Sequence, residues 1–262
     1  MCGIAGYSLN VDSRVDRTLA AQALLAGIAE RGADAVGYAH RGGGYDVTIH
    51  KQRSGATALL EEVELPHDTS ETLIHVRDYT KGHPTILANN HPIRHGSVVG
   101  IHNGIILNDE ELFARHGIDR AEPEMTVDSE VIFALMNLTP SGHAALEELR
   151  GSMATAWIDE RTATGLHLAR GVARPLWIGR SRRELFFAST KAAIEVVEGA
   201  LRLTLRKTEV SEGRLLQVER GRVVSETRFR SDCSYHDEGL LPQVRTPHEG
   251  VACLAKLAAL AP

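Results

Sequence analysis

The amino-acid sequence predicts a layered α+β fold, and two features of the chain lead to this prediction. Runs of strand-forming residues come in groups that are separated by helical segments, and no regular alternation of strand and helix continues along the chain. Regular alternation would indicate a parallel sheet, whereas grouped strands indicate sheets and helices in separate layers. The chain has 262 residues, of which 43% are hydrophobic, and this suffices for one large domain with a substantial core.

The first half of the chain combines short apolar strands with one long helix. We expect strands at residues 3–9, 35–40, 45–52, 72–77 and 98–104. Residues 15–32 have apolar side chains at helical spacing and a closing glycine, which predicts a helix. Residues 78–96 are rich in Gly, Pro, His and Asn and indicate a long loop. The strand at 98–104 is expected to run into a turn at its His-Asn-Gly end.

The second half begins with helices and continues mainly with strands. We expect helices at residues 108–116, 128–138, 142–149 and 189–199. We expect strands at residues 152–159, 165–170, 174–180, 184–188, 203–208, 213–219 and 222–229. Residues 230–247 lack periodicity, while 247–262 have Val251, Leu254, Leu257 and Leu260 at helical spacing. This last helix either packs on its own domain, which we favour, or docks on a partner chain.

Charge and cysteine content exclude several classes of protein. The formal net charge is −5, with no basic stripe, which argues against a nucleic-acid binder. The three cysteines, at positions 2, 233 and 253, form no C-x-x-C pair, so we expect a reducing compartment and no disulfide framework. The first residues lack the features of a signal peptide, and no apolar run is long enough for a membrane span. We therefore expect a cytoplasmic protein.

Cys2 is the first candidate for catalysis. Removal of Met1 would leave a thiol and a free α-amine on the same residue. The amine, with an ordinary pKa of about 7.7–8.0, can then act as general base toward the thiol without a separate histidine. A buried, inert cysteine is the more common fate of a single Cys, and position alone does not overturn that interpretation.

Six motifs in a fixed order support catalysis at Cys2. They are MCGIAG at the start, RGADAVGY (31–38), HVRDYTKG (75–82), HNGIILN (102–108), VDSE (127–130) and ARGVARPLWIG (169–179). Together they resemble the class II glutamine amidotransferases, whose glutaminase domains use an N-terminal cysteine. The resemblance runs from Cys2 to about residue 225. It implies the fold of the N-terminal nucleophile (Ntn) hydrolases, a four-layer αββα sandwich of two mostly antiparallel sheets, with Cys2 at the end of a central strand.

The chemistry of amide hydrolysis gives Asn103 and Gly104 a role beside Cys2. Attack of the thiolate on the amide makes an oxyanion, which requires hydrogen-bond donors aimed at its oxygen. The side-chain amide of Asn103 and the backbone N–H of Gly104 can supply them, and the matching family residues form that oxyanion hole. His-Asn-Gly is also a common turn sequence, which is the simpler interpretation of the tripeptide alone.

The remaining family positions concern recognition of the glutamine head group. Arg77 matches a residue that clamps the α-carboxylate, Asp128 one that accepts from the α-ammonium, and Thr80 a further substrate contact. A surface arginine and a helix-capping aspartate are the alternatives for the first two.

In the RGADAVGY segment, Arg31 and Asp34 match residues that support the nucleophile without taking part in catalysis.

Two departures from the family concern the loop after Arg77. Asp78 stands where an aromatic residue is usual, and Lys81 stands where a histidine is usual. The loop that closes over glutamine is therefore expected to be built differently.

The domain organisation also departs from the family. We expect an amidotransferase domain at 2–230 and a C-terminal extension at 231–262, which is too short for the synthase domain that usually follows. The resemblance thus implies a glutaminase that supplies ammonia from L-glutamine to a partner enzyme on a separate chain. An amidase acting on a γ-glutamyl conjugate or another small amide, and an inactive regulatory subunit that retains the fold, are the alternatives.

Histidines 75, 83, 91, 95 and 102 lie close together in the sequence and suggest a metal site. They form neither H-x-x-x-H nor H-E-x-x-H on an expected helix, and His-Pro pairs in loops are more simply turns. We expect no metal and no cofactor.

Overall fold

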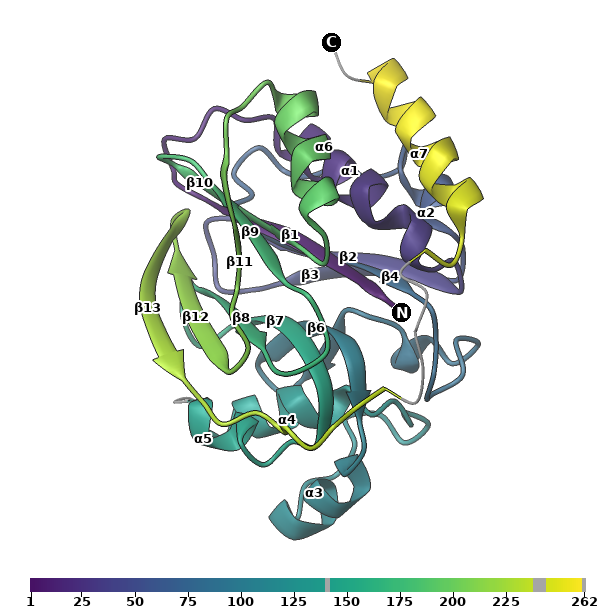
Figure 1. Cartoon of the computed structure of the whole chain (residues 1–262), viewed down its shortest axis with the longest axis vertical. Coiled ribbons are helices and arrows are strands. Elements are labelled where there is room, and N and C mark those ends of the chain that lie inside the picture. The colour runs from purple at the N-terminus through teal and green to yellow at the C-terminus, as the bar shows by residue number, and fades with distance from the viewer. Residues whose placement is uncertain (140–141, 238–243, 261–262) are drawn as a thin grey trace.

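The computed structural model describes residues 1–139, 142–237 and 244–260 of the chain. Within these residues, two β-sheets lie face to face and helices cover the outer face of each sheet (Figure 1). All neighbouring strands in both sheets run antiparallel. The structure therefore confirms the predicted αββα sandwich of two antiparallel sheets.

The first sheet contains the strand that follows Cys2. Among the described residues it has seven strands in the order β11-β9-β10-β1-β4-β2-β3. Their bounds are β1 Gly3–Leu9, β2 Ala35–Arg41, β3 Thr48–Gln52, β4 Glu71–Arg77, β9 Trp177–Arg180, β10 Glu184–Ala188 and β11 Arg206–Glu209. Strand β1 is the central strand and is buried along its whole length, which fixes the position of the residue before it.

The second sheet contains the HNG motif. In the described part of the chain it has six strands in the order β13-β12-β8-β7-β6-β5. Their bounds are β5 Ile93–His95, β6 Val98–Ile106, β7 Gly151–Asp159, β8 Leu166–Arg170, β12 Arg214–Glu219 and β13 Arg222–Arg228. Strands β6 and β7 pair over their full length, from Val98 opposite Asp159 to Ile106 opposite Gly151.

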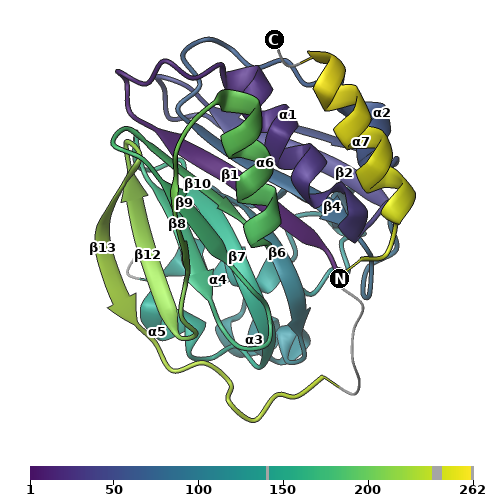
Figure 2. The same ribbon diagram turned by 45° about the horizontal axis from the view of Figure 1, so that its top comes forward.

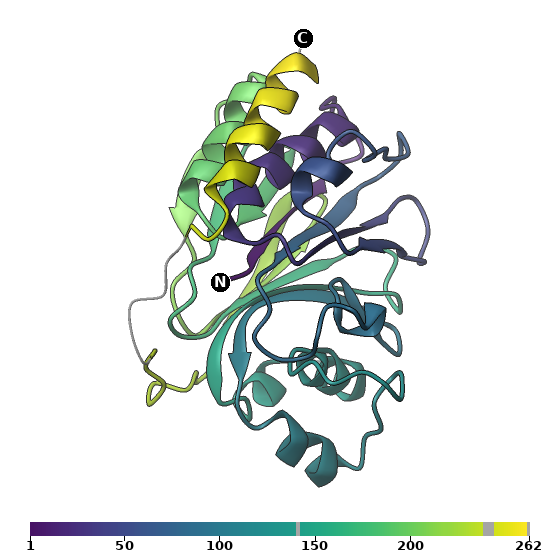
Figure 3. The same cartoon turned by 90° about the vertical axis from the view of Figure 1, so that its right-hand side faces the viewer.

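The helices form the two outer layers. Over the first sheet lie α1 Arg17–Ile28, α2 Ala56–Leu59, α6 Lys191–Leu201 and α7 Pro247–Leu260, with the 3₁₀ helix η1 Ala29–Arg31 (Figure 2). Under the second sheet lie α3 Asp109–His116, α4 Glu130–Leu138 and α5 His143–Leu146 (Figures 1 and 3). The 3₁₀ helix η2 Leu87–Asn89 lies between β4 and β5 in the sequence. None of the helices described is long and apolar enough to cross a membrane.

Three apolar clusters correspond to the three contacts between the four layers. The middle cluster joins the inner faces of the two sheets, with Ile4 and Phe187 from the first and Ile101 and Ala154 from the second. A second cluster lies between the first sheet and its helices, and a third lies between the second sheet and α4. Burial of these side chains is the main stabilising contribution to the sandwich.

Helix α7 packs on its own domain, against α1 and α2, as the favoured interpretation of this segment expects. Only part of the apolar set at helical spacing is buried. Cys253 and Leu257 enter the core, whereas Val251, Leu254 and Leu260 are exposed. The expected helix at 247–262 extends into residues 261–262, which lie outside the described residues.

Three local features of the structure differ from the sequence-based expectations. The loop at 78–96 contains η2 and β5, and α2 lies in a segment for which no helix was expected. The expected turn at His-Asn-Gly is wrong, because β6 continues through this tripeptide to Ile106. Pairing of Asn103 with Ala154 and of Gly104 with Met153 on β7 extends the strand, and this tertiary pairing overrides the local turn preference.

Candidate active site

Cys2 immediately precedes β1, the central strand of the first sheet, and Figure 3 shows the N-terminus beside the region where the two sheets face each other. Its thiol lies between two backbone groups of Asp78, donating to the carbonyl oxygen at 3.4 Å and accepting from the N–H at 3.5 Å. Burial raises the pKa of the Cys2 thiol, while the N–H of Asp78 and the nearby positive charges of the N-terminus and Arg77 oppose this rise. The thiol therefore requires a base to become a nucleophile near neutral pH.

A cavity of about 210 Å³ opens at Cys2. Four of the predicted site residues line it, namely Cys2, Thr80, Asn103 and Gly104. The other lining residues are Met1, Asp78, Tyr79, Ile105, Arg174, Tyr235 and Arg245. The structure thus brings the residues before β1, the C-terminal part of β6, the loop after β4 and part of the C-terminal segment around one cavity.

Asn103 and Gly104 have the properties expected of oxyanion-hole residues. Asn103 is fully buried, and in the described part of the chain neither atom of its side-chain amide has a hydrogen-bond partner. A buried amide without a partner is costly, and such groups are rare outside functional sites. Gly104 has a φ of +149°, and a Cβ there would lie 2.0 Å from the carbonyl oxygen of Ser152. Only glycine fits at this point of the strand.

Arg77 is placed at the end of β4, but its guanidinium does not line the cavity. It is buried and donates to the carbonyl oxygens of Lys81 and Gly82 and to the side chain of Asn90. In this structure, Arg77 therefore holds the loop that follows it. Its role as a clamp for the substrate carboxylate stays a prediction.

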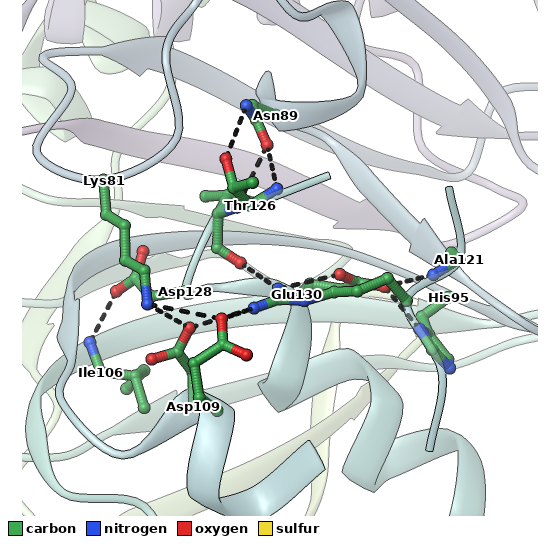
Figure 4. Close-up of polar contacts among 12 residues, drawn as sticks. Lys81, Asn89, His95, Ile106, Asp109, Ala121, Thr126, Asp128 and Glu130 are labelled. Atoms are coloured by element: carbon green, nitrogen blue, oxygen red, sulfur yellow. Dashed lines mark hydrogen bonds and ion pairs between the residues drawn. The ribbon is translucent and has the colours of Figure 1, made fainter. Parts of the chain in front are cut away.

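Asp128 is buried two residues before the start of α4 and does not line the cavity. Its carboxylate accepts a hydrogen bond of 2.6 Å from the backbone N–H of Ile106, two residues after Gly104 (Figure 4). Burial raises the pKa of Asp128 to about 6, and the negative charge of Asp109 contributes to this rise. Lys81 lowers the same pKa, and its ammonium pairs with Asp109 at 2.6 Å (Figure 4). The lysine that replaces the usual histidine thus supplies positive charge beside Asp128.

Arg31 and Asp34 support the nucleophile and the loop beside it. Arg31 is buried and donates through Nε to the carbonyl oxygen of Cys2 at 2.9 Å. Asp34 accepts from the backbone N–H of Tyr79 at 2.9 Å, and its own N–H donates to the carbonyl oxygen of Arg77 at 3.0 Å. The supporting role that the resemblance implies for these two residues stays a prediction.

Sequence reasoning missed the contribution of the C-terminal segment to the cavity. Tyr235 lines the cavity, and its hydroxyl donates to Asp237, which also accepts two hydrogen bonds of 2.8 Å from Arg174. Arg245 follows the undescribed residues 238–243 in the sequence and pairs with Asp78 at 3.1 Å. The aperiodic segment at 230–247 gives no local signal for these contacts.

The two face-to-face antiparallel sheets with helices outside form a sandwich of the Ntn-hydrolase type. A likeness to solved structures supports this class of fold. The glutamine PRPP amidotransferase from B. subtilis, complexed with ADP and GMP, superposes with a TM-score of 0.69 over 87% of this chain and 49% of that chain, at 23% identity. A glutamine aminotransferase class-II domain protein from Silicibacter pomeroyi gives a TM-score of 0.52 over 87% of this chain and 99% of its own, at 18% identity.

Sequence comparison identifies the family within this class. Residues 76–196 match the family described as the glutamine amidotransferase domain. The glutamine–fructose-6-phosphate aminotransferase (isomerizing) of Shigella flexneri is 32% identical over 240 residues, and that of Aliivibrio fischeri is 29% identical over 232 residues. Each match covers 84% of this chain but only 36% of the relative. Residues 76–196 therefore carry a glutamine amidotransferase domain, and the chain spans about a third of the length of these relatives.

Proposed function

We propose that this protein hydrolyses the side-chain amide of L-glutamine, with Cys2 as the nucleophile once Met1 has been removed. One observation carries the proposal, namely the cavity that unites Cys2 with Asn103 and Gly104. A thiol, a buried amide without a partner in the described chain and a backbone position that only glycine can occupy are the groups that acyl transfer from an amide requires.

The proposed reaction proceeds through a thioester. The α-amine of Cys2 accepts the thiol proton, and the thiolate attacks the amide carbon of glutamine. Asn103 and Gly104 stabilise the resulting oxyanion, and one such donor is worth about 2.7–4 kcal/mol in the transition state. The amine then returns its proton to the departing nitrogen, which leaves as ammonia. Water hydrolyses the γ-glutamyl thioester to glutamate and restores the thiol.

Recognition of the glutamine head group is assigned to Arg77, Asp128 and Thr80. Thr80 already lines the cavity. Arg77 lies beneath the loop and is bonded to the carbonyl oxygens of Lys81 and Gly82, so it can reach a carboxylate only after the loop shifts. Substrate binding is therefore proposed to exchange these backbone contacts for the bidentate contact that arginine makes with a carboxylate.

Replacing Cys2 tests the proposed activity. The Cys2→Ala variant, and a variant with residues added before Cys2 that block the amine, should both lose glutamate production from glutamine. Cys233→Ala is a matched control, because Cys233 is exposed and does not line the cavity. Unchanged glutamate production by Cys2→Ala would rule out the mechanism.

The use of the ammonia forms the second part of the proposal. We propose that a synthase on a separate chain accepts the ammonia, in the cytoplasm. Support for use of the nitrogen comes from the matched relatives, the glutamine–fructose-6-phosphate aminotransferases, whose name describes transfer of an amino group from glutamine to an acceptor. Glutamine labelled with ¹⁵N in its amide, added to protein captured with its partners, should transfer the label to a product. Release of the label only as free ammonium would contradict this part of the proposal.

Comparing turnover of glutamine with that of γ-glutamyl-p-nitroanilide tests the alternative amidase. A preference for the anilide would favour a γ-glutamyl conjugate as the substrate.

A further inference from the structure

Asp78 contacts the N-terminal region of the chain through its backbone and its side chain. Its N–H and carbonyl groups flank the thiol of Cys2 at 3.5 and 3.4 Å. Its carboxylate accepts a hydrogen bond from the α-ammonium of Met1 and is also 3.1 Å from Nε of Arg245. The carboxylate therefore lies between the N-terminus and a cation from the C-terminal segment.

Removal of Met1 would place the new α-amine close to this carboxylate. The backbone nitrogen atoms of consecutive residues are separated by roughly 3 Å. The α-amine of a processed Cys2 would therefore lie within about 6 Å of the Asp78 carboxylate that now binds the Met1 amine. Opposite charges at about 4–6 Å interact strongly enough to shift the pKa of each group.

We propose that Asp78 positions the α-amine of the processed Cys2 beside its thiol and that Arg245 holds Asp78 in place. This assignment rests on the proposed function, because the amine matters only if Cys2 is the nucleophile. Asp78 is a positioning residue here, since the amine transfers the proton. The backbone N–H of Arg245 donates to the carbonyl oxygen of Glu30 at 2.8 Å, next to the Arg31 that contacts Cys2. This backbone bond fixes the segment from which the Arg245 side chain reaches Asp78.

The charges around the N-terminus come from several elements. The titratable and charged groups that face it or its immediate neighbours are Glu30, Arg31, Asp34, Arg77, Asp78, Tyr79, Arg174, Tyr235 and Arg245. Asp78 and Arg245 are distinguished by their direct pair and by the contact of Asp78 with the terminal ammonium.

The two charges predict shifts of opposite sign. The negative charge of Asp78 favours the protonated forms of the amine and the thiol. Asp78→Asn removes this charge, so the acid limb, that is, the acid side of the pH–activity profile, should move to lower pH by about 0.5–1 unit. Arg245→Gln leaves the Asp78 carboxylate without its cation, so the same limb should move to higher pH by a smaller amount. Asp78→Glu restores the charge and should bring the limb back toward that of the original protein. Loss of packing alone would not produce opposite shifts.

Two measurements on the same variants test the proposal. Intact mass first establishes that Met1 is absent, and the rate of alkylation of Cys2 by iodoacetamide is then followed against pH by mass spectrometry of the N-terminal peptide. This rate follows the thiolate fraction and does not require glutamine. The pH profile of glutamine hydrolysis is the second measurement. Asp46→Asn, which removes an exposed carboxylate from the turn between β2 and β3, is the matched control.

Opposite shifts of the alkylation profile in Asp78→Asn and Arg245→Gln, with none in Asp46→Asn, would support the proposal even if no variant hydrolysed glutamine. Loss of glutamine hydrolysis in every variant would count against the proposed function alone, because the alkylation profiles test Asp78 independently. Coincident profiles in all variants, or shifts of the same sign in Asp78→Asn and Arg245→Gln, would overturn the role of Asp78.

Discussion

Asp128 is a buried carboxylate whose stability cost follows from the structure. Burial raises its pKa from the model-peptide value of 3.8 to about 6. One pKa unit corresponds to 1.36 kcal/mol, so the ionised carboxylate reduces the free energy of unfolding by about 3 kcal/mol. The folded protein holds this proton up to a higher pH than the unfolded chain does. Stability is therefore lost as the pH rises from about 4 to about 6, and the full cost applies above that range.

The Asp128→Asn variant removes this cost while keeping the local hydrogen bond. The side-chain oxygen of asparagine can still accept from the N–H of Ile106, but it carries no charge at any pH. At pH 8 we expect its free energy of unfolding to exceed that of the original protein by up to about 3 kcal/mol, and at pH 4 we expect the difference to be small. Urea denaturation followed by circular dichroism at both pH values measures this difference.

The same substitution should weaken catalysis, because the α-ammonium of glutamine would lose its proposed ionic partner. We expect the KM for glutamine to rise by about tenfold or more, as for loss of a charged hydrogen bond. Asp109→Asn is a control that is expected to change the free energy of unfolding in the opposite direction. It breaks the pairs of this buried carboxylate with Lys81 and Arg120 and should lower stability at pH 8. An Asp128→Asn protein that was less stable than the original at pH 8 would refute the reasoning.

Three further substitutions test the sandwich and the oxyanion hole. Asn103→Ala should lower kcat about 10²–10³-fold, while urea denaturation shows a stability change within about 1 kcal/mol, because its amide has no partner in the described chain; a large loss of stability would contradict this. Gly104→Ala should reduce stability by at least about 2 kcal/mol and lower the Tm, because the new Cβ meets the carbonyl oxygen of Ser152; an unchanged Tm would argue against the strand geometry. Glu71→Gln should cost about 3–5 kcal/mol in urea denaturation, because it leaves the buried Arg41 guanidinium without its anion; a neutral effect would show that the pair is dispensable.

The sequence predicted the layers of the fold and four of the residues around the cavity. Cys2, Thr80, Asn103 and Gly104 belong to motifs whose order indicates the family, and they line one cavity. Arg245 lies in an aperiodic segment more than 160 residues from Asp78 along the chain, and no local pattern indicates their contact. The buried face of α7 could not be predicted from the sequence for a related reason. Spacing shows where apolar side chains recur, but the surfaces of α1 and α2 determine which of them are buried.

The position of β1 between β4 and β10 limits the time in which Met1 can be removed before the strand is enclosed. Ala5 pairs with Ala188, so the strand that follows Cys2 gains its second neighbour only after most of the chain has been synthesised. At about 5–20 residues per second, this interval lasts roughly 10–40 s. In the folded chain, the terminal ammonium is bound by Asp78, and the Met1 side chain is 9% exposed. An aminopeptidase that removes Met1 would therefore act most readily on the nascent chain, and molecules that folded first would keep Met1 in front of Cys2.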